Sequence, residues 1–501
     1  MTWEIGCYSF TRFVFQRLLG LIYLVAFLIV VNQFKGLCGD QGLLPVRLFV
    51  KRVDFWDSPS LFWFKNSDSF MMTLAWIGLA LALAATVGIS DLFGTWLSVL
   101  IWALLWVIYL SFVNVGQTFY GFGWEMLILE TGFLAIFLGP LRAPAALILI
   151  LLIRWVLFRI MFGAGLIKIR GDTCWRDLTC LQYHYETQPM PNALSWYFHH
   201  LPQWVLRLGV VFNHFVELIV PFGFFGPRYV RIAAGLITIA FQLNLIFSGN
   251  LSWLNCLTIV LCFACFDDAF YNRLISLFTG SGNVFGNSTG GGSWFASWSV
   301  PPSLSGIPLP VIYGLLAVVL LLSIKPTINL FSSSQMMNSS FDPFHLVNTY
   351  GAFGSITRER YEIVMEGTDA SVISPETQWL AYEFKGKPGD SGFRPPQVTP
   401  YHYKLDWQMW FAAMGSYQHY PWIVNLVAKM LGGQKDVLSL LRVNPFADHP
   451  PKYVRAQLYL YRFTDPGEKP WWKRELVGTY LPPLSLDDKS FRAVLREQGW
   501  L

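Results

Sequence analysis

The chain has 501 residues, of which 54% are hydrophobic and 13% are charged, and its mean hydropathy is +0.43. A typical soluble enzyme contains fewer apolar residues, so this composition indicates an integral membrane protein. The net charge of +5 is small for this length and forms no basic run, which argues against nucleic acid as a partner.

Apolar runs that could cross a bilayer begin near the N-terminus. A transmembrane helix needs about 20 largely apolar residues. Seven runs meet this requirement and two weaker ones join them, which predicts a multi-pass α-helical membrane bundle of eight or nine helices. No small-residue cleavage site follows the first run, so we expect that run to remain as an anchor. The firm runs are 13–33, 69–90, 92–113, 143–165, 203–226, 229–248 and 251–270, and the weaker ones are 121–139 and 308–324.

The periodicity of the sequence changes after Lys325. Four segments then alternate apolar and polar residues, as half-buried strands do. Two short helical patterns, at 421–432 and 434–442, interrupt them. We therefore expect a transmembrane domain over residues 1–329, followed by a C-terminal all-β, sandwich-like domain over residues 335–501. The four segments are YEIVMEGT, TQWLAYEFKG, KYVRAQLYLYRF and KRELVGTYL.

An odd number of membrane helices has a consequence for the connections between them. With nine helices, the first long connection, the polar connection over 166–202 and the C-terminal domain all lie on one side of the membrane. Basic residues in the first connection, such as Lys51 and Arg52, favour the cytosol for this side. Arg12 and Arg17, before the first helix, favour the opposite orientation.

Several ionisable side chains fall inside or at the edges of the predicted spans. Each such group costs about 2.5–3.5 kcal/mol on insertion scales, so it is expected to face the bundle interior and find a partner. We favour a structural ion-pair network, in which an arginine neutralises a glutamate, and keep a functional polar cavity as the alternative. The residues are Glu125, Glu130, Arg154, Arg159, Arg207, His214 and Glu217.

The connection over 166–202 contains two cysteines, Cys174 and Cys180. Five residues separate them, so the Cys-x-x-Cys spacing of redox sites is absent. A helix would hold their Cα atoms about 9 Å apart, beyond the limit of roughly 7 Å for a disulfide. A disulfide is therefore possible only if the segment bends, and two reduced, structural cysteines are the favoured prediction.

The same connection is rich in histidine, proline and aromatic residues. Adjacent side chains such as His199 and His200 point about 100° apart on a helix, and a second Cys/His pair with zinc spacing is absent, so no metal site is expected. Prolines and aromatics favour a rigid lid lying on the bilayer surface. Its charged side chains are expected to fix the irregular backbone through hydrogen bonds. These are Asp172, Arg176, Asp177 and Glu186.

Two adjacent stretches resemble the signature of the lipase maturation factor family, namely GAGLIKIRGDTCWRDLTCLQYHYETQPMPNALSWYFHHLP and NHFVELIVPF. In the tail, GAFGSITRERYEIVMEG and NPFADHPPKYVRAQLYLYRFT also fit. The resemblance implies a multi-pass protein of the endoplasmic reticulum membrane, or of the plasma membrane in a bacterium. It also implies a chaperone-like function in the folding of secreted lipases or other hydrolases, with membrane lipid around it and no cofactor. The residues of the family motif and lid are Lys168, Arg170, Asp172, Trp175, Arg176, Asp177, His184, Tyr185, Glu186, His199 and His200.

A weaker similarity links the element Ala164–Lys168, followed by Trp175, to the membrane part of vitamin K-dependent carboxylases. That resemblance implies an enzyme in which Lys168 acts as a base, provided that desolvation lowers its pKa. A lysine at a helix end more often extends to the membrane interface. We therefore favour a maturation factor over an enzyme. Convergence of Lys168, His184, Glu217 and the Arg154/Arg159 pair on one cavity would favour the enzyme.

Overall fold

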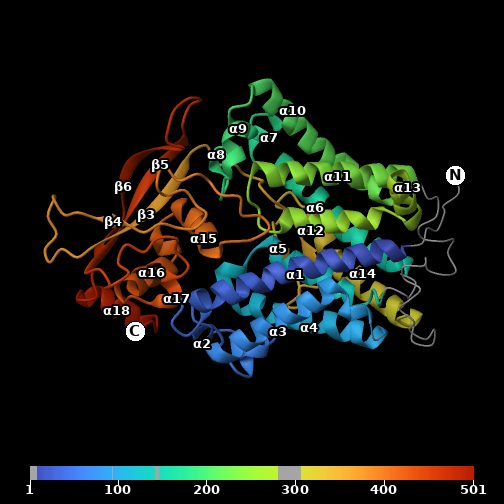
Figure 1. The fold of residues 1–501 in the computed structure, drawn as a ribbon, viewed down its shortest axis with the longest axis horizontal. Helices are drawn as coiled ribbons and strands as arrows, with labels where there is room; N and C mark the ends of the chain where they lie inside the picture. Colours follow the sequence, from blue (N-terminus) through green and yellow to red (C-terminus); the bar gives the residue numbers. More distant parts are fainter. Residues whose placement is uncertain (1–7, 93, 141–145, 280–305) are drawn as a thin grey trace.

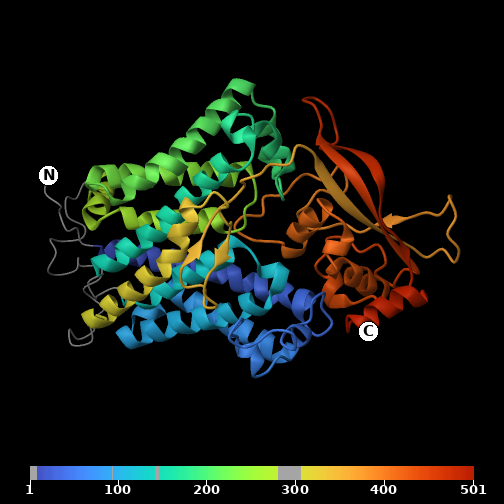
Figure 2. The same cartoon turned by 180° about the vertical axis from the view of Figure 1, so that it is seen from behind.

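The structure is a computed structural model, and it describes residues 8–92, 94–140, 146–279 and 306–501. A bundle of helices occupies one end of the molecule, and a β-sheet with several helices occupies the other end (Figures 1 and 2). The predicted order, a membrane bundle followed by a β-containing C-terminal part, is confirmed. The division of the chain into domains near residue 330 stays a prediction.

Seven helices in the described ranges are long and apolar enough to cross a membrane, or eight if one bent helix pair is a single span. This agrees with the predicted multi-pass bundle. Helix α5, Gly123–Ile136, has only 14 residues and replaces the weaker run 121–139. The seven helices are α1 (Ser9–Cys38), α3 (Asp68–Val87), α4 (Thr95–Val115), α6 (Leu147–Arg170), α10 with its continuation η4 and η5 (Gln203–Phe225), α11 (Arg228–Ser248) and α14 (Leu309–Phe331).

The helix predicted over the apolar run 251–270 is interrupted by a bend. Helix α12, Leu254–Cys262, is extended by one short turn, and the chain then bends by 100° into α13, Asp268–Thr279. The carboxylate of Asp268 at the bend accepts hydrogen bonds of 2.9 Å from the backbone N–H groups of Ser9 and Phe10. The carboxylate at the bend therefore caps the start of α1.

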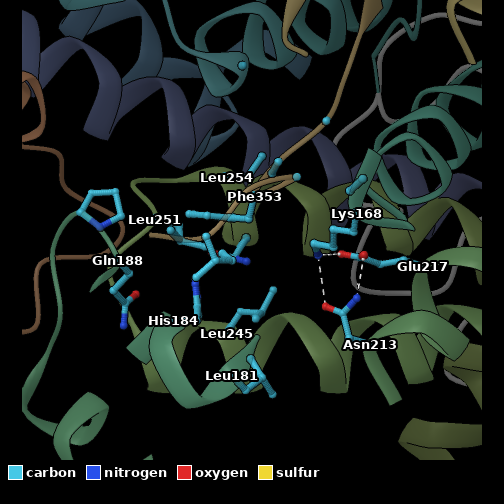
Figure 3. Close-up of a pocket in the computed structure, with 18 of the residues that line it drawn as sticks. Lys168, Leu181, His184, Gln188, Asn213, Glu217, Leu245, Leu251, Leu254 and Phe353 are labelled. Atoms are coloured by element: carbon cyan, nitrogen blue, oxygen red, sulfur yellow. Dashed lines mark hydrogen bonds and ion pairs between the residues drawn. The ribbon is translucent and has the colours of Figure 1, made fainter. Parts of the chain in front are cut away.

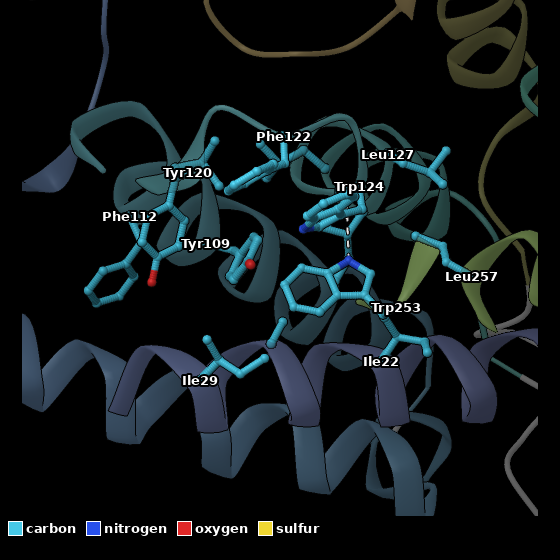
Figure 4. Close-up of a cluster of buried hydrophobic side chains, with 14 of the residues drawn as sticks. Ile22, Ile29, Tyr109, Phe112, Tyr120, Phe122, Trp124, Leu127, Trp253 and Leu257 are labelled. Atoms are coloured by element: carbon cyan, nitrogen blue, oxygen red, sulfur yellow. Dashed lines mark hydrogen bonds between the residues drawn. The ribbon is translucent and has the colours of Figure 1, made fainter. Parts of the chain in front are cut away.

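Aromatic and branched side chains form the core of the bundle between α1, α4, α5 and α12 (Figure 4). Tyr109 and Trp253 are fully buried there. The indole of Trp253 donates a hydrogen bond of 3.2 Å to the backbone oxygen of Trp124. A polar atom of a buried tryptophan thus has a partner, which lets a large ring fill the core without an unpaired donor.

The C-terminal part contains a four-stranded antiparallel sheet in the order β4-β3-β5-β6. Within the described part of residues 335–501, helices take the place of a second large sheet, because α15 packs on β3 and α16 on β5. Only Leu380 and Ala381 of the segment TQWLAYEFKG form a strand, β4. The other elements are β3 (Arg360–Thr368), β5 (Tyr453–Phe463), β6 (Trp472–Leu484), α15 (Lys404–Ala413), α16 (Trp422–Leu431), α17 (Lys435–Leu438), α18 (Lys489–Glu497) and the hairpin β1 (Ser339–Ser340) with β2 (Asn348–Thr349).

The two long connections and the C-terminal part lie on one side of the bundle, as predicted (Figure 1). Asn425 of α16 donates a hydrogen bond of 2.8 Å to the backbone oxygen of Leu43 in the first connection. Arg360 of β3 donates one of 3.0 Å to the backbone oxygen of Pro189 in the second connection. The C-terminal part is therefore docked on both connections.

Candidate functional site

A cavity of about 610 Å³ lies where the bundle, the 166–202 connection and the C-terminal part meet. Helices α6, α10, α11 and α12 contribute one wall, and α8 (Leu181–Thr187) contributes another. Residues 350–357 and helix α15 also line the cavity. Side chains far apart in the sequence thus surround one space, which Figure 3 shows in close-up.

Three polar side chains form a hydrogen-bonded triad at one side of this cavity (Figure 3). Lys168 Nζ lies 2.5 Å from Glu217 Oε1 and 3.1 Å from Asn213 Oδ1. Asn213 Nδ2 donates to the second oxygen of Glu217 at 2.8 Å. All three residues are buried, so Lys168 does not extend to the membrane interface. The lysine charge is neutralised within the triad.

Local backbone geometry brings Glu217 to Lys168. The segment Phe215–Ile219 forms a π-helical turn, η4, directly after α10 (Gln203–His214). Such bulges occur often at functional sites because they re-aim side chains within a helix. Gly165 of α6 faces this π-helical turn. A Cβ on Gly165 would lie 2.7 Å from Leu218 Cδ2 and 3.0 Å from Glu217 Cβ. The absence of a side chain at Gly165 therefore permits the close approach of α6 to the π-helical turn.

His184 of α8 also lines the cavity and is buried. Burial, and then the nearby charge of Lys168, lower the pKa of His184 to about 4. The ring is thus neutral at physiological pH. Its Nδ1 atom has no hydrogen-bond partner among the described residues, and its ring lies 5.0 Å from that of Phe353.

Cys174 and Cys180 form a disulfide, so the prediction of reduced cysteines is wrong. Helix α7 covers only Thr173–Arg176, and Leu178 adopts a positive φ of 59°. The backbone therefore turns between the two cysteines, and their Cα atoms lie 4.8 Å apart. The helical spacing used in the prediction does not apply to a bent segment.

The 166–202 connection lies between the bundle and the sheet (Figure 1), and its placement on the bilayer surface stays a prediction. Its residue Glu186 accepts a hydrogen bond of 2.6 Å from the backbone of Phe463 in β5. Its backbone at Thr187 accepts one of 3.0 Å from the indole of Trp410 in α15. The connection therefore joins the two parts of the molecule.

The charged residues of the connection differ in their roles. Asp172 pairs with Arg358 at 2.7 Å and also caps α7 by accepting a hydrogen bond from the backbone N–H of Cys174. The contact with Arg358 above all, and then that with Cys174, lower the pKa of Asp172 to about 2. Arg176 and Asp177 are exposed, and no side-chain hydrogen bond or ion pair joins them to another residue in the described ranges. The expectation that both fix the local backbone is therefore wrong for these two side chains.

The remaining motif residues occupy three separate environments. Tyr185 is buried, 5.3 Å from the ring of Phe198, whereas Arg170 is exposed and donates to the backbone oxygen of Leu330 at 2.7 Å. His199 and His200 are half-buried beside the sheet, and neither lines the cavity. Trp175 is buried, with its ring 5.0 Å from Lys168 Nζ.

The predicted intramembrane glutamates are buried and paired. Glu130 pairs with Arg159, and it accepts hydrogen bonds from Asn348 N at 3.0 Å and from the Tyr350 hydroxyl at 2.7 Å. Glu125 pairs with a residue that was not expected, Lys404 of α15. A structural ion-pair network is thus present, and the C-terminal part supplies several of its members.

The convergence that would favour an enzyme is incomplete. Lys168, His184 and Glu217 line one cavity, but Arg154 and Arg159 do not. Arg154 donates to the backbone oxygen of Ala264 at 2.8 Å instead. His214 contacts the backbone oxygen of Trp175 at 3.0 Å outside the cavity lining, and Arg207 is exposed on α10.

Comparison with known proteins identifies the family. The chain matches the family model of the lipase maturation factor transmembrane domain over residues 10–273, and that of the lipase maturation factor C-terminal domain over residues 346–482. It is 44% identical to human lipase maturation factor 1, with 99% of this chain and 91% of the relative covered. The chain belongs to the lipase maturation factor family. It is also 32% identical to lipase maturation factor 2 of Xenopus laevis, with 95% of this chain and 83% of that relative covered. No solved structure matches it.

Several residues of the cavity and of the buried ion pairs were not predicted from the sequence. Asn213 precedes Glu217 by four residues, so helical spacing was a signal that could have identified it. Lys404 and Trp410 come from the C-terminal part and carry no such signal. The carboxylase-like alternative is not supported, since the matched relatives are named maturation factors.

Proposed function

We propose that this protein is a maturation factor of the endoplasmic reticulum membrane that assists the folding and assembly of secreted lipases. The observation that carries the proposal is the 44% identity to human lipase maturation factor 1 over nearly the whole of both chains. Identity at this level extends through the membrane helices and the C-terminal part, so both are expected to serve the same activity.

The disulfide supports the assignment of the protein to the endoplasmic reticulum. Disulfides persist in oxidising environments such as the lumen of the endoplasmic reticulum, and they are rare in the cytosol. Helix α7, which contains Cys174, lies on the side of the bundle that carries the C-terminal part (Figure 1). We therefore assign this side to the lumen, where secreted lipases fold.

The contacts of the triad support a function in client binding over catalysis by Lys168. Lys168 Nζ donates hydrogen bonds to both Glu217 and Asn213, so its hydrogen-bonding contacts are made within the triad. We therefore propose that the triad positions α6 and α10, and that the protein acts through a surface for its clients.

We assign client binding to the edge strand β6. In the described part of the chain, β6 has 13 residues and pairs only with β5. Leu476 and Val477 on it are 55% and 53% exposed. An unpaired strand edge with exposed apolar residues can add a strand from an incompletely folded partner.

Complementation of cells that lack their own lipase maturation factor tests the proposal. Expression of this chain should raise the activity of a co-expressed secreted lipase per unit of lipase mass. Val477→Lys should weaken this rescue, and Val372→Lys, at a residue that is 78% exposed outside β6, serves as the matched control. Correctly inserted chain at normal abundance that leaves lipase activity unchanged would contradict the proposed function. Equal rescue by both variants would exclude β6 as the client-binding surface, but it would not contradict the proposed maturation function.

A further inference from the structure

The cavity at the Lys168–Glu217–Asn213 triad has the dimensions and lining of a ligand site. Its volume of about 610 Å³ lies within the range of about 300–1,000 Å³ that is typical of small-molecule pockets. Such pockets are largely apolar and contain a few convergent polar groups. Most of this lining is apolar, and much of it is aromatic, including Trp175, Phe198, Phe212, Phe241, Phe353 and Trp410.

The cavity is bordered by two membrane helices that diverge from each other. Figure 1 shows α10 leaning away from α11 toward the end of the bundle that carries the C-terminal part. Phe212 of α10 and Phe241 of α11 meet with ring centroids 6.1 Å apart. Leu201, just before α10, and Asn244, near the end of α11, line the cavity where the two helices are farther apart, and both residues are exposed. The cavity lining therefore includes residues that are exposed at the surface of the protein.

The charged side chains that line the cavity neutralise each other. Lys168 is the only lysine or arginine and Glu217 the only acid among the described lining residues, and they neutralise each other. His184 Nδ1 and Asn255 Oδ1 are buried and lack hydrogen-bond partners within the described ranges. Such atoms are costly unless a ligand or water satisfies them.

We propose that this cavity binds one uncharged, single-chain lipid with a hydroxyl head group, of the monoacylglycerol class. The hydroxyl groups hydrogen-bond to His184 and Asn255, and the acyl chain lies along the aromatic wall between α10 and α11. A fatty-acid carboxylate or a phospholipid phosphate requires an unpaired cation, and the described lining supplies none. Because Trp410 of α15 lines the same space, the lipid also contacts the C-terminal part.

A glycine pair allows a matched test. Gly209 of α10 lines the cavity, and a Cβ there would lie 2.8 Å from the flexible end of Leu181, so Gly209→Leu places a side chain in the cavity. Gly314 of α14 is exposed, and a Cβ on it would meet no atom within 4 Å. Gly314→Leu thus adds the same side chain to a membrane helix without changing the cavity.

The experiment uses the full chain in phosphatidylcholine nanodiscs and a photoactivatable monoacylglycerol. We expect labelling of peptides from α10 and α11 in the wild type and in Gly314→Leu, competed by unlabelled monoacylglycerol, and at least tenfold less in Gly209→Leu. Equal labelling of Gly209→Leu would overturn the proposal. So would equal labelling by a fatty-acid or phosphatidylcholine probe.

A second variant keeps the inference testable if Gly209→Leu does not fold. His184→Phe retains an aromatic ring of similar size but removes the hydrogen-bonding atoms. We expect monoacylglycerol labelling to fall about fivefold to tenfold, which corresponds to the loss of one hydrogen bond. Labelling by a probe with an alkyl chain and no hydroxyl should not change. Unchanged monoacylglycerol labelling in folded His184→Phe would contradict the assigned head-group position.

Discussion

Lys404 Nζ lies 2.6 Å from Glu125 Oε1, across 279 residues of sequence, and both side chains are fully buried. The same glutamate accepts a hydrogen bond of 2.5 Å from the Tyr109 hydroxyl. Gln33 of α1 accepts a further hydrogen bond of 3.0 Å from the backbone N–H of Lys404. The start of α15 is thus anchored inside the bundle, and the two parts of the chain share one buried polar network.

Removal of one partner of this pair should destabilise the protein strongly. Lys404→Met leaves Glu125 buried without its counter-charge, and such a change costs about 3–5 kcal/mol. The midpoint of thermal unfolding in detergent should fall clearly. The double variant Lys404→Met/Glu125→Gln should recover much of the loss, because no buried charge remains. Lys473→Met, at an exposed ion pair, is the control. A double variant as unstable as the single one would contradict this account.

The triad predicts a difference between two glutamates. Glu217→Gln removes the charge that neutralises Lys168 and should lower the free energy of unfolding by about 3–5 kcal/mol. Glu376→Gln, at an exposed side chain, should leave stability unchanged. Chemical unfolding of both purified variants, followed by tryptophan fluorescence, measures the difference. Equal stability would mean that Glu217 and Lys168 are not paired in the membrane.

The disulfide predicts which residues of the 166–202 connection matter. Loss of the bridge in Cys174→Ser/Cys180→Ser should cost about 2 kcal/mol, the value expected for a short loop. Arg176→Ala should have little effect, because its side chain is exposed and unpaired within the described ranges. Mass spectrometry after alkylation, with and without prior reduction, should show that both cysteines are blocked. Free thiols at both positions in the protein from intact cells would refute the bridge.

The buried, neutral His184 predicts a pH dependence of stability. Its pKa is about 4 in the folded protein and near 6.5 in the unfolded chain. Between these values the unfolded chain binds more protons, so stability falls as the pH decreases from about 6.5 to 4, by about 3 kcal/mol in total. His184→Gln should lose this contribution and show a flatter profile of unfolding free energy against pH. Identical slopes in the wild type and the variant would show that His184 is solvated.

The sequence by itself determined the class and order of the elements. Apolar runs of membrane length located the spans because a bilayer requires about 20 consecutive apolar residues and satisfied backbone groups. Period-two alternation located β3, β5 and β6, since one face of each strand is buried. The family motif and the intramembrane glutamates were also evident, because charged residues in apolar runs need partners wherever these lie.

Only the tertiary structure decided the partners and the site. Three contacts join residues that are far apart in sequence, and no local periodicity encodes such contacts. They are Lys404 with Glu125, Arg360 with Pro189 and Trp410 with Thr187. The bend that allows the Cys174–Cys180 disulfide depends on a positive φ at Leu178, which spacing does not reveal. The cavity likewise exists only where α6, α10, α11 and α15 meet, because its walls come from both parts of the chain.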